Sequence, residues 1–269
     1  MGLGGARWSL SSARDDEQSV RLIRHAVAQG ISLIDTARAY TTSDRSAHNE
    51  ELIARALRGL GSARDDVMVA TKGGHYRRGA DFPVDGSPAA LRRDCAASAA
   101  ALGVERLDLY FLHHPDPAVP IEESVGALDE LRAEGRVRYV GVSNVTPLLY
   151  ARASAVARVD AVENEFSPLA AADLRFAASL AQEGVAYLAY SPLGGGRRRT
   201  ATIPRDFELI AAARGVSTEQ IALAWEWAVS PGIIPIIGAG RTATLDDCID
   251  AADVVLSERE LAQLTLSVG

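Results

Sequence analysis

Apolar positions along the chain form short continuous runs, each followed by a longer stretch in which they recur with helical spacing. Residues 67–71 form one such run and are followed by helical spacing over 88–102; residues 107–112 are followed by the same spacing over 121–134. Apolar runs that alternate with amphipathic helices are typical of parallel strands covered on both faces. The pattern therefore predicts a series of strand–helix units.

Eight such units can be traced. A strand at residues 2–6 with a helix at 18–29 is the first, and seven more fall between residues 30 and 252. Eight units favour a closed (β/α)8 TIM barrel over an open doubly wound sheet, and such barrels commonly form one domain of about 250 residues. We expect residues 1–269 to form that single domain. The other strands are predicted at 32–35, 67–72, 107–113, 137–142, 159–162, 185–190 and 233–237, and the other helices at 50–60, 88–102, 121–134, 147–156, 171–182, 207–213, 218–229, 245–252 and 258–266.

Composition narrows the class of protein. The 269 residues are 48% hydrophobic and carry a formal net charge of -7, with charges of both signs interspersed. The basic stripe that nucleic-acid binding requires is absent. The one basic cluster, Arg197, Arg198 and Arg199, is either solvated or a clamp for phosphates. Without an apolar run of about 20 residues or a signal-peptide pattern, a soluble, cytoplasmic protein that does not enter a membrane is expected.

Cys95 and Cys248 are far apart in the chain and show neither a C-x-x-C pair nor a metal-ligand spacing. Two reduced thiols are the expectation, and no metal site is expected.

Polar residues whose side chains could take part in catalysis follow consecutive predicted strands. Asp35 ends the second strand, Lys72 the third and His113 the fourth, and Tyr40 lies five residues beyond Asp35. In a barrel these strand ends converge at one mouth. Burying the ammonium of Lys72 requires a nearby anion, for which Asp35 is the obvious candidate. A salt bridge at the barrel end would explain that pair alone, but not Tyr40 and His113.

Such a set suits carbonyl reduction. A phenol has a pKa of about 10, and a neighbouring ammonium favours the phenolate, so that Tyr40 can give up and recover a proton. His113 would orient the carbonyl oxygen or relay the proton. His114 is expected on the opposite side of the strand by period-two alternation.

The longest irregular stretch, residues 73–87, follows the strand that ends at Lys72, on the face where barrels keep their chemistry. We interpret it as a substrate loop. The expected substrate-pocket residues are Trp8, Tyr76, Phe82 and His114.

Five motifs resemble the aldo-keto reductase superfamily in order and spacing, over essentially the whole chain. They are Asp35-Thr-Ala-Arg-Ala-Tyr40, Thr71-Lys72-Gly-Gly, Leu109-Tyr-Phe-Leu-His113-His-Pro, Gly141-Val-Ser-Asn144 and Tyr190-Ser-Pro-Leu-Gly194. The likeness is greatest to the bacterial branch with a short C-terminus. The N-terminal hairpin that is usual in this family is expected to be absent or truncated in this chain.

The resemblance implies a catalytic tetrad of Asp35, Tyr40, Lys72 and His113, with Tyr40 as general acid. It also implies a nicotinamide cofactor bound without a Rossmann fingerprint, and no G-x-G-x-x-G follows any predicted strand. By the same resemblance, Ser143 and Asn144 would bind the carboxamide, Tyr190 would stack on the nicotinamide ring, and a loop would surround the pyrophosphate. The residues of that loop are Ser191, Leu193 and Gly195.

Two segments depart from the family's pattern. Glu163 stands where a glutamine usually contacts the carboxamide; its negative charge would favour the oxidised ring and hence substrate oxidation. The adenosine-phosphate segment has Gly238 and Asp247 at positions where the family uses other residues, which leaves Arg241 as the evident partner of a 2′-phosphate. NADPH is therefore preferred, with NADH as the alternative.

Two other functions stay open. One is a Schiff-base lyase that uses Lys72 as nucleophile, and the other is a cofactor-binding regulatory barrel without turnover. The expected partner is a small carbonyl or alcohol, and the expected state is a monomer or weak homo-oligomer. The sequence leaves the identity of the substrate and the direction of the reaction open.

Overall fold

A computed structural model describes residues 1–195 and 201–268 of the chain. Its eight strands follow one another in chain order in a closed barrel, and the described strand pairs are parallel, which confirms the predicted (β/α)8 fold. Arg197, Arg198 and Arg199 lie outside the described residues. The strands are β1 (Gly2–Gly4), β2 (Leu33–Asp35), β3 (Met68–Gly73), β4 (Leu107–Leu112), β5 (Val137–Ser143), β6 (Ala161–Glu165), β7 (Ala186–Tyr190) and β8 (Ile233–Ile237).

The predicted helices are present with ends shifted by a few residues. A five-residue helix, α1 (Ala6–Leu10), follows β1 and was not predicted, because one helical turn is too short to show a period. The other helices are α2 (Asp16–Ala28), α3 (His48–Leu57), α4 (Pro88–Leu102), α5 (Ile121–Ala133), α6 (Pro147–Ser154), α7 (Leu174–Gln182), α8 (Arg205–Arg214), α9 (Thr218–Val229), α10 (Thr242–Asp250) and α11 (Glu258–Ser267), with 3₁₀ turns η1 (Gly61–Arg64) and η3 (Ala251–Asp253).

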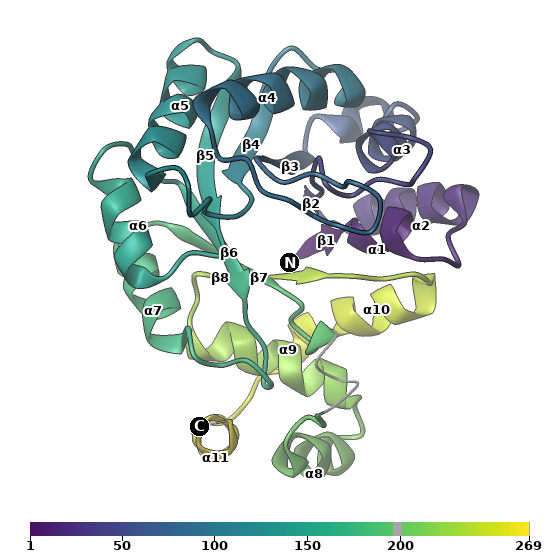
Figure 1. The fold of residues 1–269 in the computed structure, drawn as a ribbon. Coiled ribbons are helices and arrows are strands. Elements are labelled where there is room, and N and C mark those ends of the chain that lie inside the picture. The colour runs from purple at the N-terminus through teal and green to yellow at the C-terminus, as the bar shows by residue number, and fades with distance from the viewer. Residues whose placement is uncertain (196–200, 269) are drawn as a thin grey trace. The chain divides into compact units, whose positions relative to one another are not determined.

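Residues 2–163 form one compact part, which contains β1 to β5 and most of β6. Helices α2 to α6 lie on the outer side of these strands (Figure 1). The register places Lys72 beside Phe111 and Ser143 beside Glu163. Parallel pairing in this register gathers the carboxyl ends of neighbouring strands at one end of the sheet, so residues that follow those ends are brought together.

Residues 164–269, with Met1, form the second part. The rings of Phe166 and Trp225 stack there with centroids 5.5 Å apart, and the indole N–H of Trp225 donates to Thr265 Oγ1 at 3.1 Å, which fixes α9 against α11. The Ser217 side chain caps α9 by accepting from the Gln220 N–H at 3.0 Å. The spacing Ser217-Thr-Glu-Gln220 is typical of a capping box, but only half of the box forms, because the Gln220 side chain donates to Asp247 of α10 instead.

Among the described helices, none is long and apolar enough to cross a membrane. The assignment of residues 1–269 to one domain stays a prediction.

Candidate active site

Lys72 lies at the end of β3 with its side chain 1% exposed. Its ammonium pairs with Asp35 Oδ1, lies 3.1 Å from Glu163 Oε1 and donates to the backbone oxygen of Thr36 at 3.1 Å. A buried ammonium is tolerated only when anions and acceptors replace its water, and here the Asp35 carboxylate, the Glu163 carboxyl group and a backbone carbonyl do so. The predicted pairing of Lys72 with Asp35 is thus present, and Glu163 is a second partner.

Proton affinities in this cluster follow from burial and charge. Burial alone would lower the pKa of Lys72, but the charges of Asp35, Glu163 and Tyr40 outweigh it and raise that pKa above its ordinary value. Burial raises the pKa of Glu163 to about 8, with the neighbouring Asp35 adding to the effect and Lys72 opposing it. Glu163 therefore holds its proton at neutral pH, and the lysine stays charged.

Tyr40 is half-buried beside this ion pair. The Lys72 Nζ lies 5.5 Å from the centroid of the Tyr40 ring, and the ring of His113 meets that of Tyr40 edge-on at 5.8 Å between centroids. With Asp35 bound to the lysine, the structure brings all four predicted catalytic residues into one cluster.

Phe111 of β4 completes the apolar surroundings of the lysine, with its ring centroid 5.8 Å from Lys72 Nζ. Gly141 of β5 makes room for that ring, since a Cβ at this position would overlap the Phe111 side chain. A side chain at Gly141 would therefore displace a wall of the site.

His113 directly follows β4 and is 6% exposed. Burial, the charge of Lys72 and the neighbouring histidines hold its pKa well below the usual range, so the ring is neutral at physiological pH. Among the described residues, its Nδ1 has no hydrogen-bond partner. A neutral imidazole keeps one N–H, which it can donate to a carbonyl oxygen.

His114 does not point away from His113, as period-two alternation predicted. The two rings stack, with centroids 5.0 Å apart and planes 19° from parallel. The prediction was wrong because β4 ends at Leu112, so both histidines lie beyond the strand, where its alternation no longer applies.

The end of β5 carries Ser143 and Asn144. Ser143 is 1% exposed, and Asn144 adopts a left-handed backbone with φ 59°. The Asn144 side-chain amide donates to the backbone oxygen of His113 at 3.0 Å and to Ser143 Oγ at 3.0 Å. The backbone N–H of Asn144 donates to the backbone oxygen of Glu163 at 3.0 Å. Non-glycine residues in this conformation cluster at functional sites. The strained turn fixes Asn144 beside the predicted catalytic residues.

In the second part of the chain, the residues expected near the pyrophosphate form a tight turn after β7. Tyr190 ends the strand half-buried, and Ser191 has φ 54°. Gly195 has φ 45°, and a Cβ there would crowd the Ser191 side chain to 2.5 Å. Leu193 lies half-buried in the same turn. Only glycine fits the last position, so this backbone is free to approach a ligand closely.

Beyond β8, the expected adenosine-phosphate residues differ in their surroundings. Gly238 and Arg241 are exposed. Both carboxylate oxygens of Asp247 accept hydrogen bonds from the start of α9, at 2.8 Å from Ser217 Oγ and 3.0 Å from Gln220 Nε2. Asp247 therefore connects α10 to the start of α9, which is a structural role.

The predicted substrate-pocket residues do not form one group. Trp8 is 3% exposed within α1. Phe82 is 40% exposed, with its ring 5.7 Å from that of His75. Tyr76 lines a polar cavity of about 490 Å³ together with Arg77 and Arg93. That cavity and its arginines were not predicted.

Glu163 and His75 are the two site residues whose contacts the sequence reasoning missed. Glu163 was expected at the carboxamide, and the structure places it against Lys72. His75 lies two residues beyond β3, so its place near a strand end marks it as a candidate, but the path of its loop and hence its contacts do not follow from that place.

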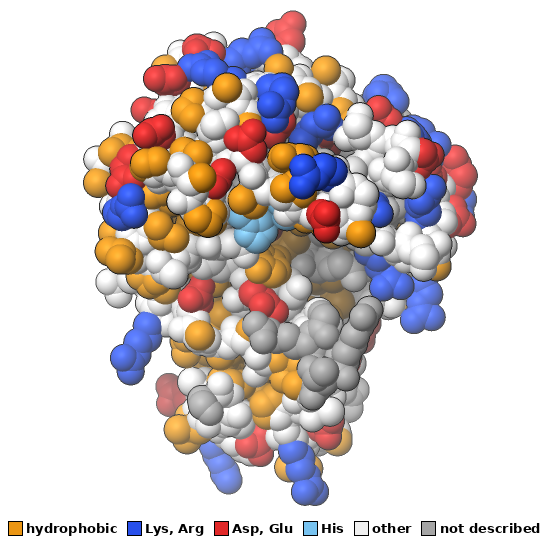
Figure 2. Space-filling model, in the orientation of Figure 1, with side chains coloured by type: hydrophobic (Ala, Val, Ile, Leu, Met, Phe, Trp, Pro, Cys, Tyr) orange, Lys and Arg blue, Asp and Glu red, His pale blue; other side chains and the backbone are white. Residues whose placement is uncertain are grey.

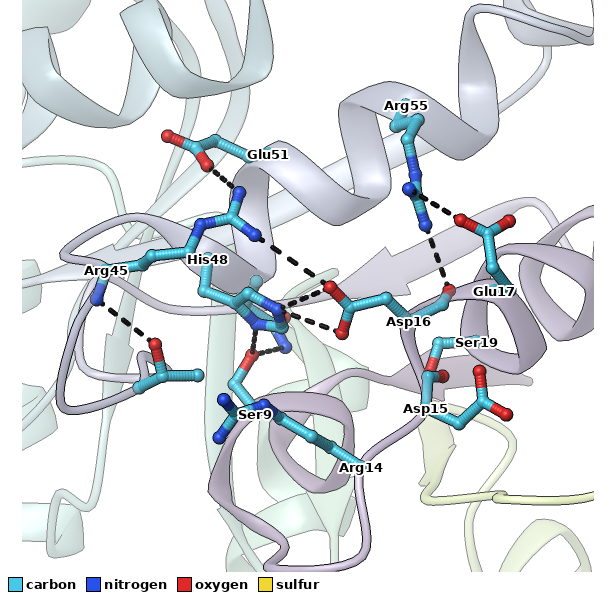
Figure 3. Close-up of polar contacts among 12 residues, drawn as sticks. Ser9, Arg14, Asp15, Asp16, Glu17, Ser19, Arg45, His48, Glu51 and Arg55 are labelled. Carbon is cyan, nitrogen blue, oxygen red and sulfur yellow. Dashed lines mark hydrogen bonds and ion pairs between the residues drawn. The ribbon is translucent and has the colours of Figure 1, made fainter.

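A Ser–His–Asp arrangement lies elsewhere, between α1, α2 and α3 (Figure 3). His48 Nδ1 is 2.8 Å from Ser9 Oγ, and its Nε2 is 3.0 Å from Asp16 Oδ1. Ser9 and His48 are each 2% exposed, so no substrate reaches the hydroxyl. These contacts join three helices and are structural.

Comparison with known proteins identifies a family to which this chain is similar. The family model described as "Aldo/keto reductase family" matches residues 1–267. The chain is 32% identical to "Probable aldo-keto reductase 1" of Glycine max over 293 residues, covering 98% of this chain and 82% of that protein.

Solved structures give the same picture. An aldo/keto reductase of Klebsiella pneumoniae in complex with NADP and acetate has a TM-score of 0.82 and 28% identity, covering 99% of this chain and 90% of that one. A glycerol dehydrogenase of Gluconobacter oxydans has a TM-score of 0.84 and 27% identity, with the same coverage.

Proposed function

Because the chain belongs to the aldo/keto reductase family and is thus an oxidoreductase, we propose that it interconverts a carbonyl and an alcohol with NADPH, with Tyr40 as the general acid and base. The observation that carries the proposal is the buried Lys72–Asp35 pair beside the Tyr40 ring. A fixed ammonium next to a phenol stabilises the phenolate, which lets the phenol transfer a proton near neutral pH.

Each residue of the cluster has a distinct task in this proposal. Asp35 holds Lys72 in place and keeps it charged. Tyr40 gives a proton to the carbonyl oxygen in reduction and takes it back in oxidation. His113, neutral and buried, donates an N–H to the same oxygen and fixes its position.

The residues present fit a nicotinamide cofactor, which supplies or accepts the hydride when bound. Ser143 and the strained Asn144 offer fixed polar groups for a carboxamide. Gly195, where a Cβ would crowd Ser191, leaves the backbone open to a phosphate group. In the family's pattern Tyr190 and Leu193 complete this set, and the proposed substrate residues are Trp8, Tyr76, Phe82 and His114.

The preference for NADPH over NADH is proposed on the basis of one residue. Arg241 is exposed at the start of α10 and offers a guanidinium for a 2′-phosphate. The Klebsiella pneumoniae relative was crystallised with NADP, which supports the same choice. Gly238 and Asp247 would lie beside the adenosine in the family's pattern.

The Schiff-base alternative is disfavoured by the ion pairs of Lys72. A nucleophilic lysine must lose its proton, which burial without anions promotes. Here Asp35 and Glu163 favour the protonated form. A positioning role for Lys72 fits these contacts better than covalent chemistry.

The test is titration of the protein with NADPH and NADH, followed by a carbonyl and alcohol panel read at the nicotinamide absorbance. Tyr40→Phe is expected to bind NADPH like the parent and to lose at least about 100-fold in kcat. Tyr139→Phe is the matched control. Tyr139 lies near the start of β5, at the end opposite Ser143, and the variant is expected to retain activity. Arg241→Ala should weaken binding of NADPH more than of NADH.

Absence of binding by either nucleotide would refute the proposal. Binding without turnover across the whole panel would favour the regulatory barrel instead. A Tyr40→Phe variant with the kcat of the parent would show that Tyr40 is not the general acid and base.

A further inference from the structure

Three histidines meet beside the proposed catalytic cluster. His75 comes from the loop after β3, and His113 and His114 follow β4. The His75 ring centroid is 4.7 Å from each of the other two, and one ring nitrogen from each residue lies within 4.8 Å of the others. In the proposed function His113 meets the carbonyl oxygen and His114 lines the substrate pocket, whereas His75 has no role, so its convergence on both rings needs its own explanation.

The hydrogen bonds leave lone pairs available in this cluster. The Nε2 of His75 lies 2.9 Å from the backbone oxygen of Phe82, which can only accept, so Nε2 carries the proton and Nδ1 carries the lone pair. That Nδ1 and the Nδ1 of the buried His113 have no hydrogen-bond partner in the described part of the chain. Histidines that bind metals typically donate their other N–H to a backbone carbonyl or carboxylate, as His75 does to Phe82.

The charge state of the cluster also suits a cation. The side chains of Tyr40, Phe82 and Asn144, which lie against the three rings, carry no positive charge. The buried cation Lys72 is matched by Asp35 and faces Glu163 as a second carboxyl. Neutral imidazoles are the form that binds metal.

We propose that His75, His113 and His114 bind one divalent transition-metal ion of the zinc type. Zn–N bonds of about 2.0–2.1 Å at tetrahedral angles place ligand nitrogens about 3.4 Å apart. The ligand nitrogens lie within 4.8 Å of one another, so they need to approach by at most about 1.4 Å to reach that spacing, a movement of the scale of side-chain rotation and a shift of the His75 loop. The weak 3.4 Å contact from the Asn144 amide to His114 Nε2 offers little resistance to rotation of that ring.

The donor set selects the class of ion. Three imidazoles suit Zn²⁺, Cu²⁺ or Ni²⁺, whereas Mg²⁺ and Ca²⁺ prefer oxygen ligands. Histidine atoms (pale blue) are seen at the surface near the centre of the face shown in Figure 2. His75 and His114 are both half-buried, which gives an ion access from solvent. A fourth coordination position would stay open to water.

Occupancy of this site has a consequence that rests on the proposed function. The His113 ring would both orient the carbonyl oxygen and bind the ion, and it lies edge-on to the Tyr40 ring at 5.8 Å between centroids, so the ion and its bound water would crowd the place of the carbonyl. Zn²⁺ is therefore an inhibitor that competes with the carbonyl substrate.

Binding is tested without cofactor or turnover. The full chain, freed of metal by chelation, is titrated with ZnCl₂ by calorimetry, and with CoCl₂ by the visible absorption of four-coordinate Co²⁺. About one equivalent is expected to bind with a four-coordinate Co²⁺ spectrum. His75→Gln and His114→Gln should each weaken binding at least about tenfold. His25→Gln in α2 is the matched control, and MgCl₂ is the negative probe.

Thermal unfolding shows whether each variant is folded, and two variants are used so that one misfolded protein does not decide the test. Absence of saturable Zn²⁺ binding by the parent overturns the proposal. So does binding by both folded variants that is as tight as by the parent, which would assign the ion to another place such as the thiols of Cys95 or Cys248.

Kinetics separate this proposal from the proposed function. Zn²⁺ is expected to raise the apparent KM for the carbonyl in the parent, with at least about tenfold more Zn²⁺ needed for His75→Gln. Zinc binding without any carbonyl turnover would support the metal site and refute the function. Turnover with zinc bound and rates unchanged would overturn the inhibitory consequence.

Discussion

The replacement Glu163→Gln tests the central ion cluster most directly. Glu163 is 1% exposed, and its pKa is about 8 in the folded protein against an ordinary value of 4.5. The folded protein holds this proton to a higher pH than the unfolded chain does. Its contribution to stability is therefore complete below pH 4.5 and is lost as the pH rises to about 8.

The size of the effect follows from the same two values. A difference of 3.5 pH units at about 1.36 kcal/mol each gives about 5 kcal/mol. Glutamine keeps the shape of the protonated carboxyl and has no proton to lose. Part of this effect lies below pH 5, so the free energy of unfolding of Glu163→Gln should rise relative to the parent by up to about 4 kcal/mol between pH 5 and pH 9.

Urea unfolding of both proteins at several pH values from 5 to 9 measures this difference. Glu105→Gln, the same substitution at an exposed site, is the control and should follow the parent at every pH. Parallel pH profiles for Glu163→Gln and the parent would refute the reasoning, because Glu163 would then ionise alike in the folded and unfolded chain.

The same pKa limits how Glu163 can affect the redox direction. With a pKa of about 8, roughly 10% of the carboxyl is ionised at pH 7 and about 90% at pH 9. A charge that favours oxidised nucleotide is then mostly absent at neutral pH. The ratio of Kd for NADP⁺ to Kd for NADPH should be alike in parent and Glu163→Gln at pH 7 and should diverge at pH 9.

Two further predictions concern packing and burial. Gly141→Ala should destabilise the fold by about 1–3 kcal/mol in urea unfolding, since the added Cβ overlaps Phe111. The control is Gly126→Ala in α5, where an added Cβ meets no atom within 4 Å. This control should be neutral or stabilising by up to about 1 kcal/mol. Glu226→Gln should raise Tm at pH 8 and leave it nearly unchanged at pH 4, because burial holds the pKa of Glu226 well above 4.5 and neither of its oxygens has a hydrogen-bond partner among the described residues. An equal Tm difference at both pH values would contradict this account of Glu226.

The sequence by itself determined the barrel and the cluster that follows its strand ends. Apolar runs that alternate with helical spacing permit few architectures other than a covered parallel sheet. Once the strands are parallel and in chain order, Asp35, Lys72 and His113 must emerge at the same end. A buried lysine then requires its carboxylate, so local pattern and charge were sufficient.

Tertiary structure decided the contacts that depend on where side chains point beyond a strand. Glu163 reaches Lys72 because β6 pairs with β5 in a register that the chain order alone does not specify. His114 stacks on His113 because β4 stops one residue before them. The loop that carries His75 has no periodicity from which its path could be predicted. Periodicity specifies the face of a regular element, whereas the end of an element, its register and the path of a loop are set by packing against the rest of the fold.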